Sequence, residues 1–181
     1  MTLTGATRGE PLLSLSIIYA RSQNHCIGHQ GKVPWQLPAE YASFDEITCG
    51  HAIIMGRRSY EDHQCALPRR LNIVISRQQN YRVAEGVILV NSLEAALLEA
   101  HSQAQQAFII GGVSLILSSM PHATAVFETV VDAHIDGDTF IPPQNFSQFS
   151  AEVLLQRGPD ADHAYGFTVH HYRRPAHNAC V

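Results

Sequence analysis

The sequence has no long apolar run and no block of like charge, and each absence excludes a class of protein. Hydrophobic residues make up 45% of the 181-residue chain, yet no run approaches the roughly 18 residues that span a bilayer. Lys and Arg number 12 against 16 Asp and Glu, which gives a formal net charge of −4. Nucleic acids and anionic membranes need a basic face, so we predict that this protein binds neither.

Cysteine is also scarce, and its spacing matches no zinc or redox motif. The four residues are Cys26, Cys49, Cys65 and Cys180. Free thiols are typical of a reducing compartment, so we predict a cytoplasmic protein. The 11 histidines are scattered rather than paired one helical turn apart, and we therefore predict no metal site.

Short apolar runs alternate with helical patterns along the chain, and no internal repeat occurs. Strands are predicted at 13–20, 52–55, 72–76, 87–90, 107–110 and 125–132, followed by an antiparallel pair at 151–157 and 165–173. Helices are predicted at 38–48, 59–63, 91–101 and after the glycines at 111–112, with Asn91 as the N-cap of the third. This alternation predicts an α/β fold with a mainly parallel sheet, helices on both faces and an antiparallel C-terminal hairpin. We expect one domain over 12–174, with loose ends at 1–11 and 175–181.

Three turns carry residues that are typical of anion sites, although the standard G-x-G-x-x-G dinucleotide motif is absent. They are Gly56 to Ser59, Ser76-Arg77 and Gly111-Gly112, each placed where a strand is predicted to end. Glycine lets the backbone approach a phosphate, and free amides at a helix start attract it. Each turn alone also fits a plain sharp turn or a solvated helix end. Together, at one edge of a parallel sheet, they favour one polyphosphate ligand.

One carboxylate lies where the first helix should be apolar. Leu37, Tyr41, Phe44 and Ile47 form a helical stripe, and Glu40 shares it. Two interpretations remain open on the residues alone. Glu40 is either an acid that faces a ligand or a first-turn acid favoured by the helix dipole.

Five ordered motifs resemble those of the dihydrofolate reductase family over about residues 13–173. They are IGHQGKVPWQLPAE, AIIMGRRSYE, LPRRLNIVISR, IIGGVSLI and DGDTFIP. The resemblance implies an eight-stranded mixed sheet with about four helices. It also implies hydride transfer from NADPH to C6 of 7,8-dihydrofolate, with protonation at N5. Glu40 would then hold the pterin ring through its 2-amino group and ring N–H.

The resemblance also assigns roles to individual positions of this sequence. The catalytic residues would be Trp35, Glu40 and Thr129. The substrate, dihydrofolate, would contact Ile18, Ala20, Glu40, Tyr41, Phe44, Arg70, Ile110 and Thr129, with Arg70 pairing the carboxylate of its glutamate tail. NADPH would contact Ala20, Ile27, Gly28, Lys32, Gly56, Arg57, Arg58, Ser59, Ser76, Arg77, Asn91, Gly111, Gly112, Val113 and Ser114. Gly28, Gly31 and Lys32 would lie in a mobile lid.

Four positions depart from the family's usual bacterial pattern. Glu40 stands where bacterial members usually carry Asp, and Tyr19, Ile116 and Cys65 are also unusual. Bacterial members that tolerate trimethoprim can carry Glu at the acid position, so we hypothesise weakened binding of antifolate inhibitors. We expect a monomer. Two alternatives are a pyrimidine reductase of riboflavin synthesis, against which the PWQLPAE stretch argues, and a non-catalytic nucleotide-binding module.

Overall fold

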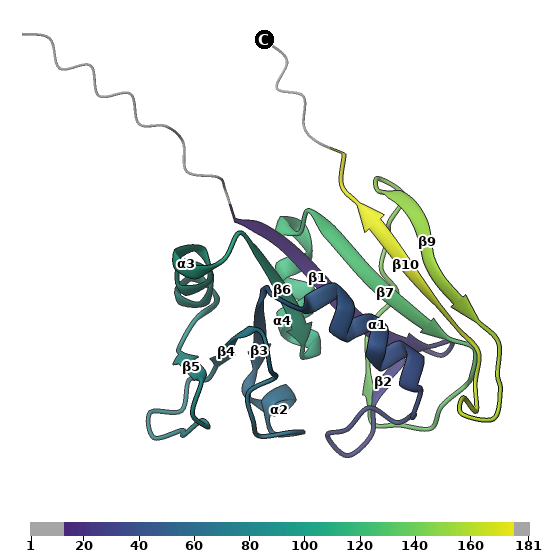
Figure 1. Cartoon of the computed structure of the whole chain (residues 1–181), viewed down its shortest axis with the longest axis horizontal. Coiled ribbons are helices and arrows are strands. Elements are labelled where there is room, and N and C mark those ends of the chain that lie inside the picture. Colours follow the sequence, from purple (N-terminus) through teal and green to yellow (C-terminus); the bar gives the residue numbers. More distant parts are fainter. Residues whose placement is uncertain (1–12, 176–181) are drawn as a thin grey trace, which may run out of the picture.

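A mixed sheet of eight strands runs through the protein, as a computed structural model of residues 13–175 shows (Figure 1). The strand order is β5-β4-β3-β6-β1-β7-β10-β9. All neighbours from β5 to β7 pair in parallel, whereas β10 is antiparallel to both β7 and β9. The strands are β1 (Ser14–Ser22), β3 (Ala52–Gly56), β4 (Leu71–Ile75), β5 (Val87–Val90), β6 (Gln106–Gly111), β7 (Ala125–Val131), β9 (Ser150–Arg157) and β10 (Phe167–Arg173). The predicted mixed sheet and its C-terminal hairpin are therefore confirmed.

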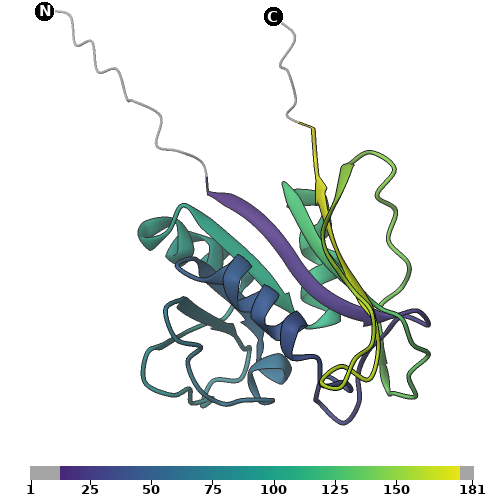
Figure 2. The ribbon, with the colours of Figure 1, turned by 45° about the vertical axis from the view of Figure 1, so that its right-hand side comes forward.

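Helices cover both faces of this sheet, as predicted (Figures 1 and 2). They are α1 (Pro38–Thr48), α2 (Arg57–Tyr60), α3 (Leu93–Gln103) and α4 (Val113–Ser119), with a 3-10 turn, η1 (Met120–His122). Side chains of α1 and α2 pack into one apolar cluster with Ile18 and Phe108. Side chains of α3 and α4 pack into another with Ile17 and Ile109. Because neighbouring strand residues point to opposite faces, each of the six strands from β5 to β7 in the sheet supplies both clusters.

The central strands read as continuous apolar runs because both of their faces are covered. All four residues of the AIIM segment in β3 are buried, from Ala52 to Met55. Buried parallel strands have this composition rather than an alternating one. The predicted strand positions agree with the structure to within two residues at each end.

Two local predictions were wrong and one feature was missed, each for a physical reason. Helix α2 begins at Arg57, not at Ser59, because Gly56 is extended and already acts as its N-cap. The N-cap of α3 is Ser92, not Asn91, since the Ser92 hydroxyl accepts the Ala95 N–H at 3.1 Å. A small second sheet of β2 (Cys26–Gly28) and β8 (Thr139–Phe140) was not predicted, because such short strands carry no periodic pattern.

Two further predictions concern membrane-spanning segments and the two ends of the chain. Within residues 13–175, none of the helices has the length and apolar character needed to cross a membrane. The predicted loose ends at 1–11 and 175–181 lie, apart from Pro175, outside the residues that the structure describes.

Candidate active site

The carboxyl ends of the six parallel strands lie along one edge of the sheet, and the predicted anion-binding turns lie there. Met55 pairs with Gly111, and Gly56 pairs with Ile75, which immediately precedes Ser76. Ile75 in turn pairs with Val90, the residue before Asn91. Ligands of open α/β sheets bind beyond this edge. The three turns therefore lie side by side, as the sequence predicted.

Two of these turns touch closely. A Cβ added to Gly111 would lie 2.8 Å from the Ser59 hydroxyl, and one added to Gly56 would lie 3.7 Å from the Gly112 nitrogen. Gly111 has φ +144°, a conformation that side chains rarely adopt. Val113 and Ser114 follow at the start of α4. Glycine at these positions lets the two turns approach each other, and Gly56 and Gly112 are partly exposed at the sheet edge, whereas Gly111 is buried.

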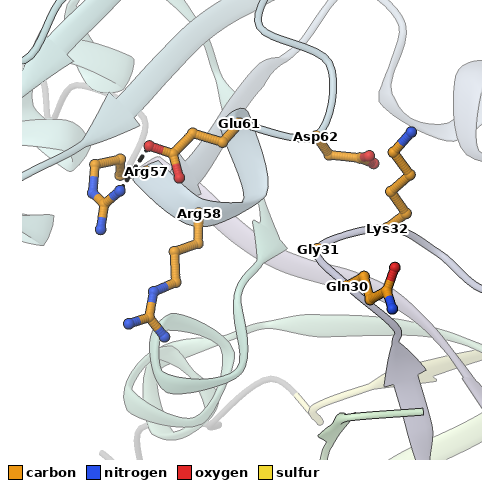
Figure 3. A pocket seen from close by; sticks show the side chains of 7 residues that line it. All are labelled: Gln30, Gly31, Lys32, Arg57, Arg58, Glu61 and Asp62. Atoms are coloured by element: carbon orange, nitrogen blue, oxygen red, sulfur yellow. Dashed lines mark hydrogen bonds and ion pairs between the residues drawn. The ribbon is translucent and has the colours of Figure 1, made fainter.

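A cleft of about 390 Å³ opens beside these turns (Figure 3). Figure 3 shows that α2 and the residues after it form one wall, and the loop at 30–32 forms the other. The cleft is lined by Gln30, Gly31, Lys32, Arg57, Arg58, Glu61 and Asp62. Arg57 donates to the Glu61 carboxylate at 2.7 Å, and Arg58 is exposed. Three cationic side chains at one cleft suit a ligand with several phosphates.

The loop from Gly28 to Lys32, the lid loop below, is held by one carboxylate. The backbone N–H of Gln30 donates to the Asp138 carboxylate at 2.7 Å, and the Asp138 N–H donates to the Gly28 carbonyl at 3.1 Å. The bond from the Gln30 N–H, and after it one from the Thr139 hydroxyl, lowers the pKa of Asp138 from its ordinary value. Gln30 and Gly31 both have positive φ, as a tight reversal of the chain requires.

Glu40 is buried on the α1 face of the sheet, which is expensive for a carboxylate. Its exposed fraction is 8%. Burial raises the pKa of Glu40 to about 7, and a hydrogen bond from the Thr129 hydroxyl partly opposes this rise. Thr129 pairs with Ala20 across β7 and β1. The predicted acid and the predicted threonine are therefore brought together, and the carboxylate has spare capacity for donors from a ligand.

Trp35, five residues before Glu40 in the chain, has an unused donor. The side chain is 3% exposed, and its Nε1 atom is buried without a hydrogen-bond partner among residues 13–175. Tyr41 is 41% exposed, and its hydroxyl donates to the Trp35 carbonyl at 2.6 Å. Because buried donors are almost always paired in native proteins, the indole N–H is suited to a water molecule or a polar ligand atom.

Apolar residues predicted to contact the substrate surround the same region. Ile18 is buried, and Phe44 and Ile110 pack against its cluster. Ala20 packs against the cluster that contains Trp35. Ile27, predicted to contact the cofactor, lies in β2 and packs against the cluster on the α3 and α4 face. The other residues provide apolar surface on the α1 face, where Glu40 is buried, an arrangement typical of small-molecule sites.

Arg70 is placed differently from the surface arginine that its sequence context alone would suggest. Its side chain is 1% exposed. It donates to the Asp45 carboxylate at 2.6 Å, to the Thr48 hydroxyl at 2.9 Å and to the Pro68 carbonyl at 2.7 Å. Its guanidinium carbon also lies 5.7 Å from the centre of the Phe44 ring. Arg70 is therefore tied to the carboxyl end of α1, and any ligand carboxylate would share it with Asp45.

The unusual positions lie in different surroundings. Tyr19 and Ile116 belong to the apolar cluster on the α3 and α4 face, opposite Glu40. Cys65 is an exposed free thiol. Two residues of consequence were missed, Asp138 and His163. Asp138 lies in the DGDTFIP motif and could have been found there, whereas His163 lies in an aperiodic polar loop without such a signal.

Comparisons with known proteins agree with this geometry. The sequence profile named "Dihydrofolate reductase" matches residues 14–174. A dihydrofolate reductase from Neisseria gonorrhoeae is 42% identical over 89% of this chain and 98% of its own length. Another from Neisseria meningitidis is 38% identical over 90% of this chain and 99% of its own. The structure of the dihydrofolate reductase from Enterococcus faecalis, complexed with NADP(H) and RAB-propyl, superposes with a TM-score of 0.82 at 28% identity. This superposition covers 90% of this chain and 96% of the Enterococcus faecalis chain.

Proposed function

This chain belongs to the dihydrofolate reductase family, and we propose that Glu40, Trp35 and Thr129 form the centre of its active site. The protein reduces 7,8-dihydrofolate to 5,6,7,8-tetrahydrofolate as an oxidoreductase of one-carbon metabolism. The family match decides against the pyrimidine reductase and the non-catalytic nucleotide-binding module. The individual site residues are our own assignment, and one observation carries it. Glu40 is a buried carboxylate whose side-chain support comes from Thr129.

A pterin ring would supply what Glu40 lacks. Its 2-amino group and adjacent ring N–H are two parallel donors, and a carboxylate accepts such a pair with both oxygens. Hydrogen bonds to a charged group are each worth about 1.5–3 kcal/mol. They favour the ionised acid, so binding would bring the pKa of Glu40 down from about 7. The same pair of bonds would fix the orientation of the ring between Ile18 and Phe44.

Protonation at N5 needs a route that does not use Glu40 directly, because the acid would be occupied at the far rim of the pterin. A water molecule is the proposed carrier. The unpaired indole N–H of Trp35 supports a water site beside the ring. Thr129 would keep the acid in place while the proton moves.

The cofactor is NADPH, which supplies the hydride. Ala20, Ile27 and Gly28 would contact the nicotinamide end, and Lys32 would close the cleft above it. Gly56, Gly111, Gly112, Val113 and Ser114 would lie against the bridging phosphates. The adenosine end would be held by Arg57, Arg58, Ser59, Ser76, Arg77 and Asn91. An arginine contact to the 2′-phosphate would favour NADPH over NADH.

The walls of the proposed pterin site are Ile18, Ala20, Tyr41, Phe44 and Ile110. Arg70 is the proposed partner of the glutamate tail. Its bond to the Asp45 carboxylate would compete with that tail. Asp45 is 59% exposed whereas the Arg70 side chain is 1% exposed, so a ligand carboxylate would have to take the place of Asp45 on the guanidinium.

Replacement of Glu40 by Gln tests the assignment. Glu40→Gln keeps the shape but cannot accept two donors, so we expect hydride transfer at neutral pH to fall by about 100-fold or more, the size of two lost hydrogen bonds to a charged group. NADPH binding should be unchanged. Stopped-flow absorbance at the NADPH band measures the chemical step. Glu46→Gln, an exposed position on the same helix, is the matched control. A normal chemical step in Glu40→Gln would refute the assignment.

The length of Glu40 also bears on inhibitors. Glutamate extends one methylene further than the aspartate usual in bacterial members, so a rigid diaminopyrimidine inhibitor must shift to be held. We propose that trimethoprim binds weakly for this reason. Glu40→Asp should increase inhibition, measured as the trimethoprim concentration that halves the rate. Inhibition of the unaltered enzyme at ordinary trimethoprim concentrations would overturn this proposal.

We further propose that the enzyme acts as a single-domain monomer over 12–174 in the cytoplasm. The free thiols of Cys26, Cys49 and Cys65 support a reducing compartment. Light scattering of the purified chain measures the oligomeric state, and a stable dimer would contradict it.

A further inference from the structure

Helix α1 begins without an ordinary cap. Its N-cap residue is Leu37, which has no side-chain acceptor, and Pro38 follows without an N–H. The Glu40 and Tyr41 N–H groups donate to the Leu37 carbonyl at 2.9 and 3.1 Å. The Ala39 N–H is then the first-turn donor that the helix itself leaves unpaired.

That donor is satisfied from a distant part of the chain. The Ala39 N–H donates to Nε2 of His163 at 3.0 Å. His163 lies in the loop that joins β9 to β10, and it is 3% exposed. Its ring also packs at 6.2 Å from the core ring of Phe167. A buried imidazole therefore takes the place that Ser or Asp usually occupies at a helix start.

The imidazole is held in one tautomer. Because Nε2 accepts a hydrogen bond from the Ala39 N–H, it carries no proton of its own, so Nδ1 bears the ring proton. Nδ1 lies 2.7 Å from the Asp160 carboxylate and donates to it. That carboxylate also accepts from Arg157 at 2.8 Å and from the Asp162 N–H at 2.9 Å. These donors, His163 first, hold the pKa of Asp160 well below its usual range.

We propose that His163, oriented by Asp160, is a positioning residue for Glu40 and hence for dihydrofolate. The inference rests on the proposed role of Glu40. Glu40 directly follows the capped residue, and its buried carboxylate tolerates little displacement if it is to accept two parallel donors from the pterin. Without the cap, the first turn of α1 frays and the carboxylate loses its fixed place. Binding of NADPH, at the strand ends, does not depend on this turn.

Two replacements of His163 separate the hydrogen bond from the packing. His163→Leu keeps an apolar side chain but no acceptor, whereas His163→Gln keeps an oxygen near the position of Nε2. In His163→Leu we expect kcat/KM for dihydrofolate to fall about fivefold, the size expected from one lost helix cap. The KM for NADPH should not change. His163→Gln should restore most of the loss, and Asp160→Ala should lie between the two.

Ser92→Ala is the matched control, because it removes the single side-chain cap of α3 on the other face of the sheet. Amide hydrogen exchange should accelerate at Ala39 in His163→Leu and at Ala95 in Ser92→Ala. Only the first change should alter dihydrofolate kinetics. If amide exchange at Ala39 accelerates in His163→Leu but its kcat/KM for dihydrofolate equals that of Ser92→Ala, the positioning role is wrong. Failure of the proposed function would appear elsewhere, as normal hydride transfer in Glu40→Gln.

Discussion

Two buried glutamates lie on opposite faces of the same sheet, and their surroundings differ sharply. Glu128, in β7, is 3% exposed, and Glu40, in α1, is 8% exposed. Glu128 accepts the Tyr19 hydroxyl at 2.8 Å and the Arg21 Nε at 2.7 Å. Glu40 is supported through Thr129, the residue that follows Glu128 and points to the other face.

The difference separates a carboxylate that serves the fold from one that serves a ligand. Burial and the nearby Glu128 raise the pKa of Tyr19, so its phenol stays protonated and keeps donating. Arg21 supplies the opposite charge. Glu128 is thus satisfied within the protein, whereas Glu40 keeps a raised pKa of about 7 until donors arrive. Two carboxylates of similar burial therefore have different roles, and the number of hydrogen-bond donors around each one within the protein distinguishes them.

Glu128→Ala should give the largest effect, and on stability rather than on chemistry. It leaves Arg21 and the Tyr19 hydroxyl without their shared acceptor inside the protein. Removing one member of a buried ion pair costs about 3–5 kcal/mol, and the partial exposure of Arg21, 18%, places this case near the lower end. Urea denaturation measures the loss. The rate of hydride transfer per folded molecule should stay close to normal.

A triple replacement shows whether the cost comes from stranded partners. Tyr19→Phe, Arg21→Met and Glu128→Leu together remove the acid and the two side chains that donate to it at short distance, so within residues 13–175 the hydroxyl of Tyr172 is the one partner of Glu128 that remains. The triple variant should recover most of the stability that Glu128→Ala loses, because a packed apolar cluster replaces a buried ion pair at little cost. Equal instability of both variants would mean that packing, not charge, dominates this face.

Glu40→Gln should increase the free energy of unfolding, and by less than Glu128→Ala decreases it. The acid has a pKa of about 7 when folded and an ordinary value of 4.5, so the folded state binds more protons between these values. Stability of the unaltered protein therefore falls as pH rises through this window and is level above it. Relative to it, Glu40→Gln should gain on the order of 2 kcal/mol between about pH 5 and about pH 8.

Thermal or urea unfolding of both proteins at several pH values measures this difference. Other titrating groups are shared by the two proteins and cancel when one curve is subtracted from the other. A difference that stays constant with pH would show that Glu40 is already ionised and satisfied in the free enzyme. In that case the contrast with Glu128 would disappear.

Much of the fold was predictable, because strong local signals agree with the final structure. Helix α1 matches its predicted bounds, 38–48, since Pro38 fixes its first residue. The apolar runs of β3 and β4 could only be buried strands. Helix α2 was shifted by two residues because a single turn has too few residues to show a period. The pair of β2 and β8 depends on contacts between segments more than 100 residues apart.

The site was predictable to the extent that its residues lie in recognisable motifs. Glu40 stood out as an acid in an apolar stripe, and the structure places it beside Thr129. The hydrogen-bond acceptor of the Ala39 N–H could not be predicted, because His163 lies 124 positions further along the chain. Tyr19 was noticed only as an unusual residue, because its bond to Glu128 joins two strands that the sequence does not pair by itself.

Thr129→Val gives the smallest expected effect, and it bears directly on the support that Glu40 has. Valine has the shape of threonine without the hydroxyl, so the one bond that lowers the pKa of Glu40 disappears while its burial remains. The pKa of Glu40 should rise further, by about one unit or less, the size of one hydrogen bond. The pH dependence of hydride transfer should move upward with it, so that activity falls at neutral pH and recovers at higher pH. Thr129→Ser keeps the hydroxyl and should leave the profile in place. A profile that moves equally in both variants would trace the shift to packing of β7, and Thr129 would then resemble Glu128 more closely than Glu40.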